Sequence, residues 1–242
     1  MSVYLDKIYE KQKLIVARVY QAISYSFTGA KEFGLRSFLI SVYSVKRKHA
    51  VQRINELAEL LQLIKRLRIR IDIVLEIGTA FGGNLYFLSR FAGLNADIIS
   101  IDLPPQIDGL SRQMRKLRKL CLSNELRKNV RRSQNIHLLR CDSHAKATLD
   151  EVRDILEGRF VDLLFIDGDH TYIGAKQDYE VYSPLVQKGG LIIFHDIRRY
   201  VGKPEAEVDK LWNELKKNNP KYYEIFDDAD MDSDSGIGVI IK

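Results

Sequence analysis

Five short apolar segments, separated by stretches with helical spacing, constrain the fold of this 242-residue chain more than any other feature. Each segment is apolar through its middle rather than alternating, which is typical of strands buried on both faces of a parallel sheet. Because strands alternate with helices, the pattern predicts a doubly wound α/β fold. The five predicted strands span residues 71–78, 96–102, 136–142, 161–169 and 191–196.

Outside these five strands, the chain is expected to form helices and one later pair of strands. Residues 1–48 show no strand pattern and are predicted to form an N-terminal helical appendage to a main domain at 49–242. Residues 222–227 and 236–241 are expected to form a terminal β-hairpin. The other predicted helices span residues 50–67, 84–91, 111–124, 143–156, 172–185 and 203–217.

An acidic residue lies at the end of every predicted parallel strand. In open α/β sheets the ligand binds at the carboxyl ends of the strands. Acids scattered over loops would lie at both edges, so their gathering at one edge predicts a functional site there. The five residues are Glu76, Asp102, Asp142, Asp167 and Asp196.

The first strand ends in a glycine-rich loop, E-I-G-T-A-F-G-G-N, at residues 76–84. Gly78, Gly82 and Gly83 permit a tight turn and close approach of a ligand, and the following helix N-terminus can face an anionic group. The spacing matches neither the dinucleotide fingerprint nor a P-loop. Glu76 can instead hold a cationic amine near the loop; the alternative is a plain strand-to-helix turn.

Two later strand ends suggest contacts to a nucleoside. Asp102 can accept both ribose hydroxyls, or it can cap a helix. Asp142 and Ser143 can meet an adenine amino group and ring nitrogen, or they too can cap the helix that follows.

The segments EIGTAFGGN, IDLP, CDS and FIDGDHTYIGAKQDYEVYSPLVQKGGLIIFHDI resemble class I S-adenosylmethionine-dependent methyltransferases. More narrowly, they resemble the subgroup of cephalosporin-hydroxylase-like proteins and macrolide sugar O-methyltransferases. The resemblance covers about residues 50–242 and implies a seven-stranded Rossmann-like sheet whose last strand is antiparallel. Ala80 stands where many of these enzymes have glycine. The cofactor-binding residues expected from the loop and the resemblance are Glu76, Gly78, Thr79, Ala80, Gly82, Gly83, Asn84, Asp102, Asp142, Ser143 and Asp167.

A second group of chemically active residues follows the fourth and fifth strands. In this fold type those strands are neighbours, about 4.8 Å apart, so Asp167 and Asp196 can share one ion. Oxygen ligands favour Mg²⁺, Ca²⁺ or Mn²⁺, and a bound ion lowers the pKa of a substrate hydroxyl. His170 can then take the proton. In the alternative, Asp167 and His170 bind loop backbone and no metal is present.

The resemblance adds roles to this second group. In the related sugar O-methyltransferases the metal is held by acids matching Asp167 and Asp196, with an acid where this chain has His195. The histidine matching His170 is the base in those relatives. We therefore expect Asp167 and His170 to be catalytic, and Asp167, His195 and Asp196 to hold Mg²⁺ or Mn²⁺.

These motifs predict an enzyme that uses S-adenosylmethionine to methylate a hydroxyl of a small sugar-like or natural-product acceptor. Arg112, Arg115 and Lys119 are expected to bind an anionic group of that acceptor. One alternative is an RNA methyltransferase, because residues 1–72 and 112–132 each carry a net charge of +8. Against it, Asp167-Gly-Asp-His stands where amino-methylating enzymes carry an N-P-P-Y-like tetrapeptide. The other alternative is a non-catalytic protein that binds the cofactor.

The sequence also bears on location and assembly. Two cysteines cannot make a disulfide framework, so a reducing cytoplasm is expected. The longest mostly apolar stretch, about residues 33–45, is too short to span a bilayer. Aromatic residues along the N-terminal segment predict an apolar helical face and, from it, a homo-oligomer.

Overall fold

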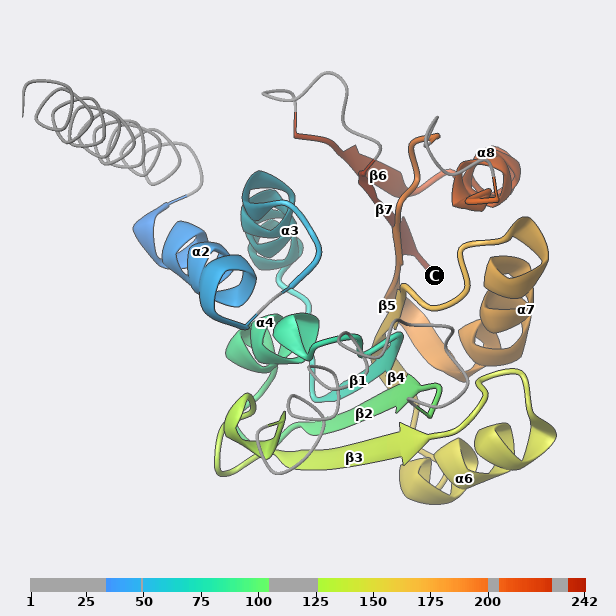
Figure 1. The fold of residues 1–242 in the computed structure, drawn as a ribbon, viewed down its shortest axis with the longest axis horizontal. Coiled ribbons are helices and arrows are strands. Elements are labelled where there is room, and N and C mark those ends of the chain that lie inside the picture. The colour runs from blue at the N-terminus through green and yellow to red at the C-terminus, as the bar shows by residue number, and fades with distance from the viewer. Residues whose placement is uncertain (1–33, 49, 105–125, 200–204, 228–234) are drawn as a thin grey trace, which may run out of the picture.

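The computed structural model describes residues 34–48, 50–104, 126–199, 205–227 and 235–242. In this part of the chain seven strands form one sheet with the order β3-β2-β1-β4-β5-β7-β6 (Figure 1). The strands are β1 (Ile73–Ile77), β2 (Asp97–Asp102), β3 (Asn135–Arg140), β4 (Val161–Ile166), β5 (Val186–His195), β6 (Tyr222–Ile225) and β7 (Ile237–Ile241).

The direction of the strands confirms the predicted fold class. Strands β1 to β5 pair in parallel, and β7 pairs antiparallel with both β5 and β6. The strand order reverses at β1, with β2 on one side and β4 on the other. This is a doubly wound, Rossmann-like sheet with a terminal antiparallel hairpin, and its switch point lies between β1 and β4.

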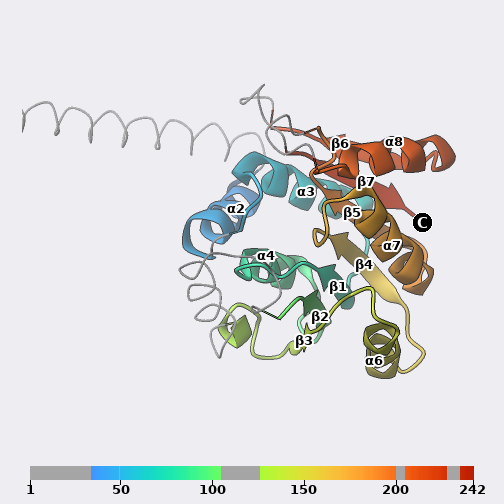
Figure 2. The same ribbon diagram turned by 45° about the vertical axis from the view of Figure 1, so that its right-hand side comes forward.

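Helices cover both faces of the sheet (Figures 1 and 2). Helices α3 and α4 lie on one face, with α2 packed against both of them. Helices α6, α7 and α8 lie on the other face. The helices are α2 (Leu35–Lys48), α3 (Ile54–Leu67), α4 (Gly83–Phe91), α6 (Lys146–Leu156), α7 (Tyr172–Tyr182) and α8 (Val208–Asn218), with short 3₁₀ turns η1 (Leu126–Lys128) and η2 (Ser183–Leu185).

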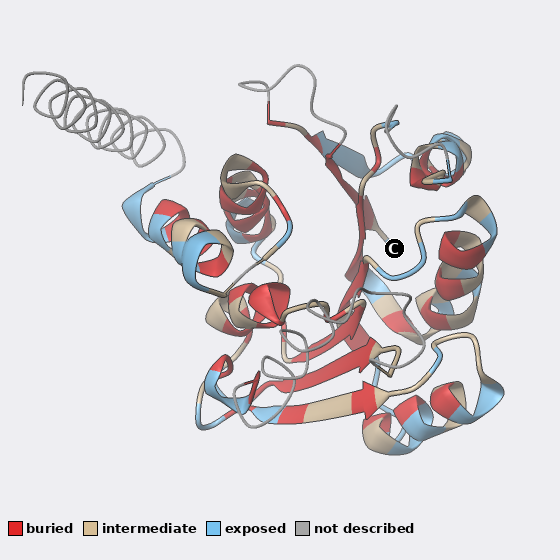
Figure 3. Cartoon of the chain, viewed as in Figure 1, coloured by how far each residue is buried: buried red, intermediate tan, exposed pale blue. Residues whose placement is uncertain are grey.

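Two hydrophobic cores explain why the central strands are apolar without alternation (Figure 3). Successive side chains of a strand point to opposite faces, so a strand covered on both sides buries them all. In β1, Val74 packs into the core under α3 and α4, whereas its neighbour Leu75 packs into the core under α6, α7 and α8. All five residues of β1 are buried.

Several helices differ from their predicted bounds; α3 and α8 begin later than predicted, at Ile54 and Val208. Two others differ for local reasons that the structure shows. The helix predicted at 143–156 begins at Lys146, because the Asp142 carboxylate accepts the backbone N–H of His144 and forms a turn first. The helix predicted at 172–185 ends at Tyr182 and continues as a 3₁₀ turn that contains Pro184. Proline has no N–H to continue the α-helix.

Helix α2 is packed onto the rest of the fold. Its Phe38 is buried, and Ser37 accepts hydrogen bonds from Gln62 and Lys65 of α3 at 2.8 and 2.6 Å. The division at residues 48 and 49 stays a prediction. Residues 1–33 and the predicted helix at 111–124 lie outside the described residues. Among the described helices, none has the length and apolar character needed to cross a bilayer.

Candidate active site

A cavity of about 1060 Å³ lies above the carboxyl ends of β1, β2, β4 and β5. The strand register brings these ends together, because Ile77 pairs with Ile101 on one side and with Ile166 on the other. The residues predicted from the sequence that line the cavity are Gly78, Ala80, Asp102, Asp142, Ser143, Asp167, His170, His195 and Asp196.

The glycine-rich loop is shaped by contacts within the protein. Gly78 has a φ of 95°, and a Cβ at this position would lie 2.0 Å from the backbone oxygen of Asp167. Ala80 also has a positive φ of 44°, and its N–H donates to the Asp102 carboxylate at 3.0 Å. The loop from β1 is therefore held against both neighbouring strand ends.

Three residues predicted to bind the cofactor lie at the start of α4 and do not line the cavity. A Cβ on Gly82 would meet the Leu126 side chain, and one on Gly83 would meet the backbone of Ala50, each at 2.0 Å. Asn84 is 4% exposed. Close packing therefore explains why glycine occupies both positions. Contacts of Gly82, Gly83 and Asn84 with a cofactor stay predictions.

Glu76 is the penultimate residue of β1; like Thr79 it does not line the cavity, and it has no exposed surface. Its Oε2 accepts a hydrogen bond of 2.6 Å from Ser100, which is itself hydrogen-bonded with Thr79 at 2.5 Å. Its Oε1 is buried without a hydrogen-bond partner. Burial raises the pKa of Glu76 to about 8, with the Ser100 hydrogen bond opposing this and Asp167 and Asp102 adding to it. An ammonium group placed beside this carboxyl would favour its ionised form.

Glu76 is expected to make the stability of the ligand-free protein fall with rising pH. Its pKa is raised from an ordinary value of about 4.5 to about 8, so in this window the folded protein holds a proton that the unfolded chain has released. The free energy of unfolding therefore falls as the pH rises from about 4.5 to 8. Glu76→Gln should remove this slope and exceed the wild type in stability at pH 8, as measured by urea unfolding. Glu151→Gln, at an exposed position of α6, is the control; equal slopes for wild type and Glu76→Gln would contradict this account.

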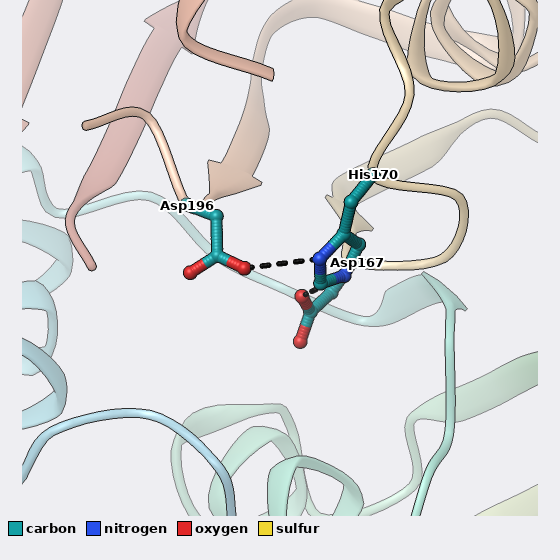
Figure 4. Close-up of side chains that lie close together, drawn as sticks. All are labelled: Asp167, His170 and Asp196. Atoms are coloured by element: carbon teal, nitrogen blue, oxygen red, sulfur yellow. Dashed lines mark ion pairs between the residues drawn. The ribbon is translucent and has the colours of Figure 1, made fainter. Parts of the chain in front are cut away.

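The second predicted group forms a cluster of carboxylates and imidazoles (Figure 4). The His170 ring lies between the two acids: Nε2 is 3.5 Å from Asp167 Oδ1, and Nδ1 is 3.2 Å from Asp196 Oδ2. The buried His195 ring also faces both acids, with Nδ1 3.2 Å from Asp167 Oδ1 and 3.1 Å from Asp196 Oδ1. The structure therefore brings together all four residues predicted for catalysis and metal binding.

The charges in this cluster stabilise one another. Burial opposes ionisation of Asp167, but His195 and His170 outweigh it and lower the pKa of that carboxyl. The hydrogen bond with Asp167 raises the pKa of His170 against the effect of burial. Burial also opposes a charge on His195, but Asp167, Glu56 and Asp196 raise its pKa well above the ordinary value.

The cluster has the donors of a metal site. One ligand atom from each of Asp167, His170 and Asp196 lies within 4.8 Å of the other two. Two carboxylates and an imidazole suit Mn²⁺, and the carboxylates suit Mg²⁺. His195, which the sequence placed among the ligands, lies beside this trio and is only 4% exposed.

Three residues that contact this cluster or each other beside it, Gln52, Glu56 and Ser235, were not predicted from the sequence. The Gln52 side-chain N–H donates to Asp167 Oδ2 at 2.6 Å, and Ser235 Oγ donates to the buried carboxylate of Glu56 at 2.7 Å. Ser235 also lies 3.3 Å from His195 Nε2. One signal was present, because Glu56 is an acid within the apolar stripe of α3. Arg112, Arg115 and Lys119 lie outside the described residues.

Comparison with known proteins agrees with the fold. A family model described as "Methyltransferase domain" matches residues 75–197, about half of the chain. Uncharacterized protein R132 of Acanthamoeba polyphaga mimivirus is 30% identical over 154 residues, which is 62% of this chain and 64% of that protein. Uncharacterized protein y4gI of Sinorhizobium fredii (strain NBRC 101917 / NGR234) is 31% identical over 88 residues, 36% of this chain and 10% of that protein. The chain thus spans less than two thirds of the length of either curated relative.

Two solved structures share the fold. The O-methyltransferase TomG from Streptomyces achromogenes, solved with S-adenosylmethionine, is similar with a TM-score of 0.54 and 17% identity over 85% of this chain and 89% of that one. The O-methyltransferase from Bacillus cereus, solved with S-adenosylhomocysteine, has a TM-score of 0.50 and 16% identity over 86% and 89%. Strand order, antiparallel β7 and the family match define a methyltransferase domain built on a doubly wound, Rossmann-like sheet. This chain belongs to the methyltransferase domain family.

Proposed function

We propose that this protein transfers the methyl group of S-adenosylmethionine to a hydroxyl oxygen of a small sugar-like or natural-product acceptor. The observation that carries the proposal is one cavity with two chemically different halves. Gly78, Asp102 and Ser143 line the half that follows β1, β2 and β3, and His170 and Asp196 line the half that follows β4 and β5. A methyl donor and an acceptor placed in the two halves would meet above the end of β4.

The first half fits an adenosyl amino acid. Asp102 presents a carboxylate that can accept ribose hydroxyls, and Asp142 and Ser143 lie at the next strand end for an adenine ring. The buried Oε1 of Glu76 has no hydrogen-bond partner, and in this proposal the ammonium of the ligand supplies one. The cofactor, when bound, supplies a methyl group on a sulfonium, which needs no further activation as an electrophile.

The second half fits the activation of a hydroxyl. His170 is 38% exposed at its side chain and is oriented by Asp167 and Asp196, so it can accept the acceptor's O–H proton at a ring nitrogen. The oxygen lone pair forms the new bond to the methyl carbon, and the electrons of the broken carbon–sulfur bond stay on sulfur. Buried walls around Asp167 limit water, and positioning supplies much of the rate.

The same residues would hold a divalent ion. Asp167 and Asp196 would supply oxygen ligands and His195 the nitrogen ligand, which leaves His170 as the base. A bound Mg²⁺ or Mn²⁺ would lower the pKa of the acceptor hydroxyl. The buried His195 ring would also shield the two carboxylates from bulk solvent on the inner side of the cluster.

The proposal is tested by release of S-adenosylhomocysteine. The protein is incubated with S-adenosylmethionine and a panel of free sugars, nucleotide sugars, phenols, amines and total RNA, and the product is measured by mass spectrometry. We expect release only with hydroxylated small molecules, and none when that hydroxyl is already methylated. Release only with RNA or amines would contradict the proposal. Binding of the cofactor without release for any compound would support a non-catalytic binding protein instead.

Metal dependence is expected to follow the two carboxylates. Mn²⁺ should bind the wild type in calorimetry, and Asp196→Asn should weaken this binding at least about tenfold because one charged ligand is lost. Asp154→Asn, at an exposed position of α6, serves as the control for charge. Equal Mn²⁺ binding by wild type and Asp196→Asn, or full turnover in EDTA, would show that the cluster acts without an ion.

A homo-oligomer in a reducing cytoplasm stays part of the proposal. Sedimentation of the full chain at micromolar concentration tests the assembly, and a monomer would contradict it.

A further inference from the structure

Asp178 in α7 is a fully buried acid that lies outside the group of acids at the strand ends. Its Oδ1 accepts a hydrogen bond of 2.7 Å from Ser143 Oγ and lies 3.2 Å from Nε2 of His144. Its Oδ2 is buried without a hydrogen-bond partner. Burying a carboxylate costs free energy unless it is paired. The contacts to Ser143 and His144 offset part of this cost, and we therefore ask what the buried acid does for these two residues.

The two contacted residues form part of the cavity wall. Ser143 and His144 belong to the loop between β3 and α6, and both line the cavity. Helix α7 holds this loop at two further points: the Tyr182 hydroxyl donates to the Ser143 backbone oxygen at 2.7 Å, and the His144 ring lies 3.2 Å from the Gly174 backbone oxygen. The loop shape thus depends on one face of a helix that follows the catalytic His170.

We infer that Asp178 is a positioning residue for the cofactor: through Ser143 and His144 it fixes the loop that forms the adenosine end of the cavity. The inference rests on the proposed function, which places an adenosyl ligand in this half of the cavity. Asp178 does not line the cavity itself, so it acts only through the loop.

The charges around Asp178 make this support sensitive to pH. His144 and Asp142 face it from the β3–α6 loop, Asp169 faces it from the β4–α7 loop, and Tyr182 lies one turn along its own helix. Burial raises the pKa of Asp178 to about 6, opposed by Ser143 and His144 and reinforced by Asp169 and Asp142. Below this pH the carboxyl is neutral and its hydrogen bond from Ser143 is weaker, because bonds to an ionised acceptor are the stronger kind.

The test measures the dissociation constant of S-adenosylhomocysteine by calorimetry between pH 5 and 7.5. Asn has the shape of a neutral Asp, so Asp178→Asn should bind about tenfold more weakly than wild type at pH 7.5. The wild type should lose more affinity than Asp178→Asn as the pH falls through about 6, and the two should converge at pH 5. Asp150→Asn in α6, whose carboxylate pairs with Lys146 on the surface, is the matched control and should follow the wild type.

Each outcome separates the inference from the proposed function. The inference would be overturned if Asp178→Asn bound S-adenosylhomocysteine within twofold of the wild type at pH 7.5. It would also be overturned if both proteins had the same pH profile. Either outcome would leave the proposed function intact. No binding of S-adenosylhomocysteine by the wild type would overturn both. If Asp178→Asn does not fold, Ser143→Ala removes the same hydrogen bond from the loop side. Because Ser143 also lines the cavity, its readout is the pH profile: this variant should lose less affinity than the wild type as the pH falls through about 6, and the same profile as the wild type would overturn the inference.

Discussion

Gly78→Ala is expected to weaken S-adenosylhomocysteine binding at least about a hundredfold and to lower the free energy of unfolding by about 2–5 kcal/mol. The added Cβ would lie 2.0 Å from the Asp167 backbone oxygen and 2.5 Å from its carbonyl carbon. Neither atom belongs to a flexible side chain, so β1 and β4 must move apart at the edge where the cavity begins. Displacing this strand end also moves Asp167, which connects the two halves of the site.

Gly189→Ala separates this contact from the cost of the backbone conformation alone. Gly189 has a φ of 83°, close to the 95° of Gly78, but a Cβ there would meet no atom within 4 Å. We expect it to cost only the about 1–2 kcal/mol of a left-handed residue and to leave ligand affinity unchanged. Urea unfolding and calorimetry measure both variants. If the two variants lost equal stability and equal ligand affinity, the close approach of β1 to β4 at Gly78 would not explain the effect of Gly78→Ala.

His170→Ala is expected to lower kcat by about 10²–10⁴-fold with S-adenosylhomocysteine affinity unchanged within about twofold. The His170 ring is the exposed imidazole of the cluster, and both of its nitrogens face carboxylates. Removing it takes away the proton acceptor while leaving the glycine-rich loop and Asp102 in place. Turnover is measured with the acceptor identified by release of S-adenosylhomocysteine, and His137→Gln in β3 controls for loss of an imidazole elsewhere.

The pH profile adds a second reading of the same residue. The Asp167 hydrogen bond raises the pKa of His170, and only the neutral ring can accept a proton. In the wild type kcat should therefore rise with pH through a midpoint above 6.5 and then level off, and in His170→Ala this rise should disappear. A variant that keeps both the rate and the rise would assign the base to another group.

The sheet could be predicted because its signal is local. Residues 73–75 of β1 and 163–166 of β4 are apolar without alternation, which is the pattern expected of strands buried on both faces. The edge of the site followed from topology alone, since parallel strands bring Asp102, Asp167 and Asp196 to the same side. These elements needed no knowledge of tertiary packing.

The residues that support the site could not be predicted in the same way. Gln52 lies 115 residues from Asp167, and Ser235 lies 179 residues from Glu56. Their contacts depend on how α3 and the β6–β7 hairpin pack against the sheet. Such tertiary packing cannot be predicted from a short stretch of sequence. The role of Asp178 could not be predicted either, because its partners Ser143 and His144 follow a different strand.

The most direct test of the whole account is the thermal stability of the protein with S-adenosylmethionine, S-adenosylhomocysteine, NAD⁺ and NADP⁺, each with and without Mn²⁺. A ligand at 100 times its Kd adds about 2.7 kcal/mol to the free energy of unfolding. The account predicts stabilisation by the two adenosyl amino acids alone, lost in Gly78→Ala. Stabilisation by a nicotinamide cofactor alone, or by none of the four, would contradict it.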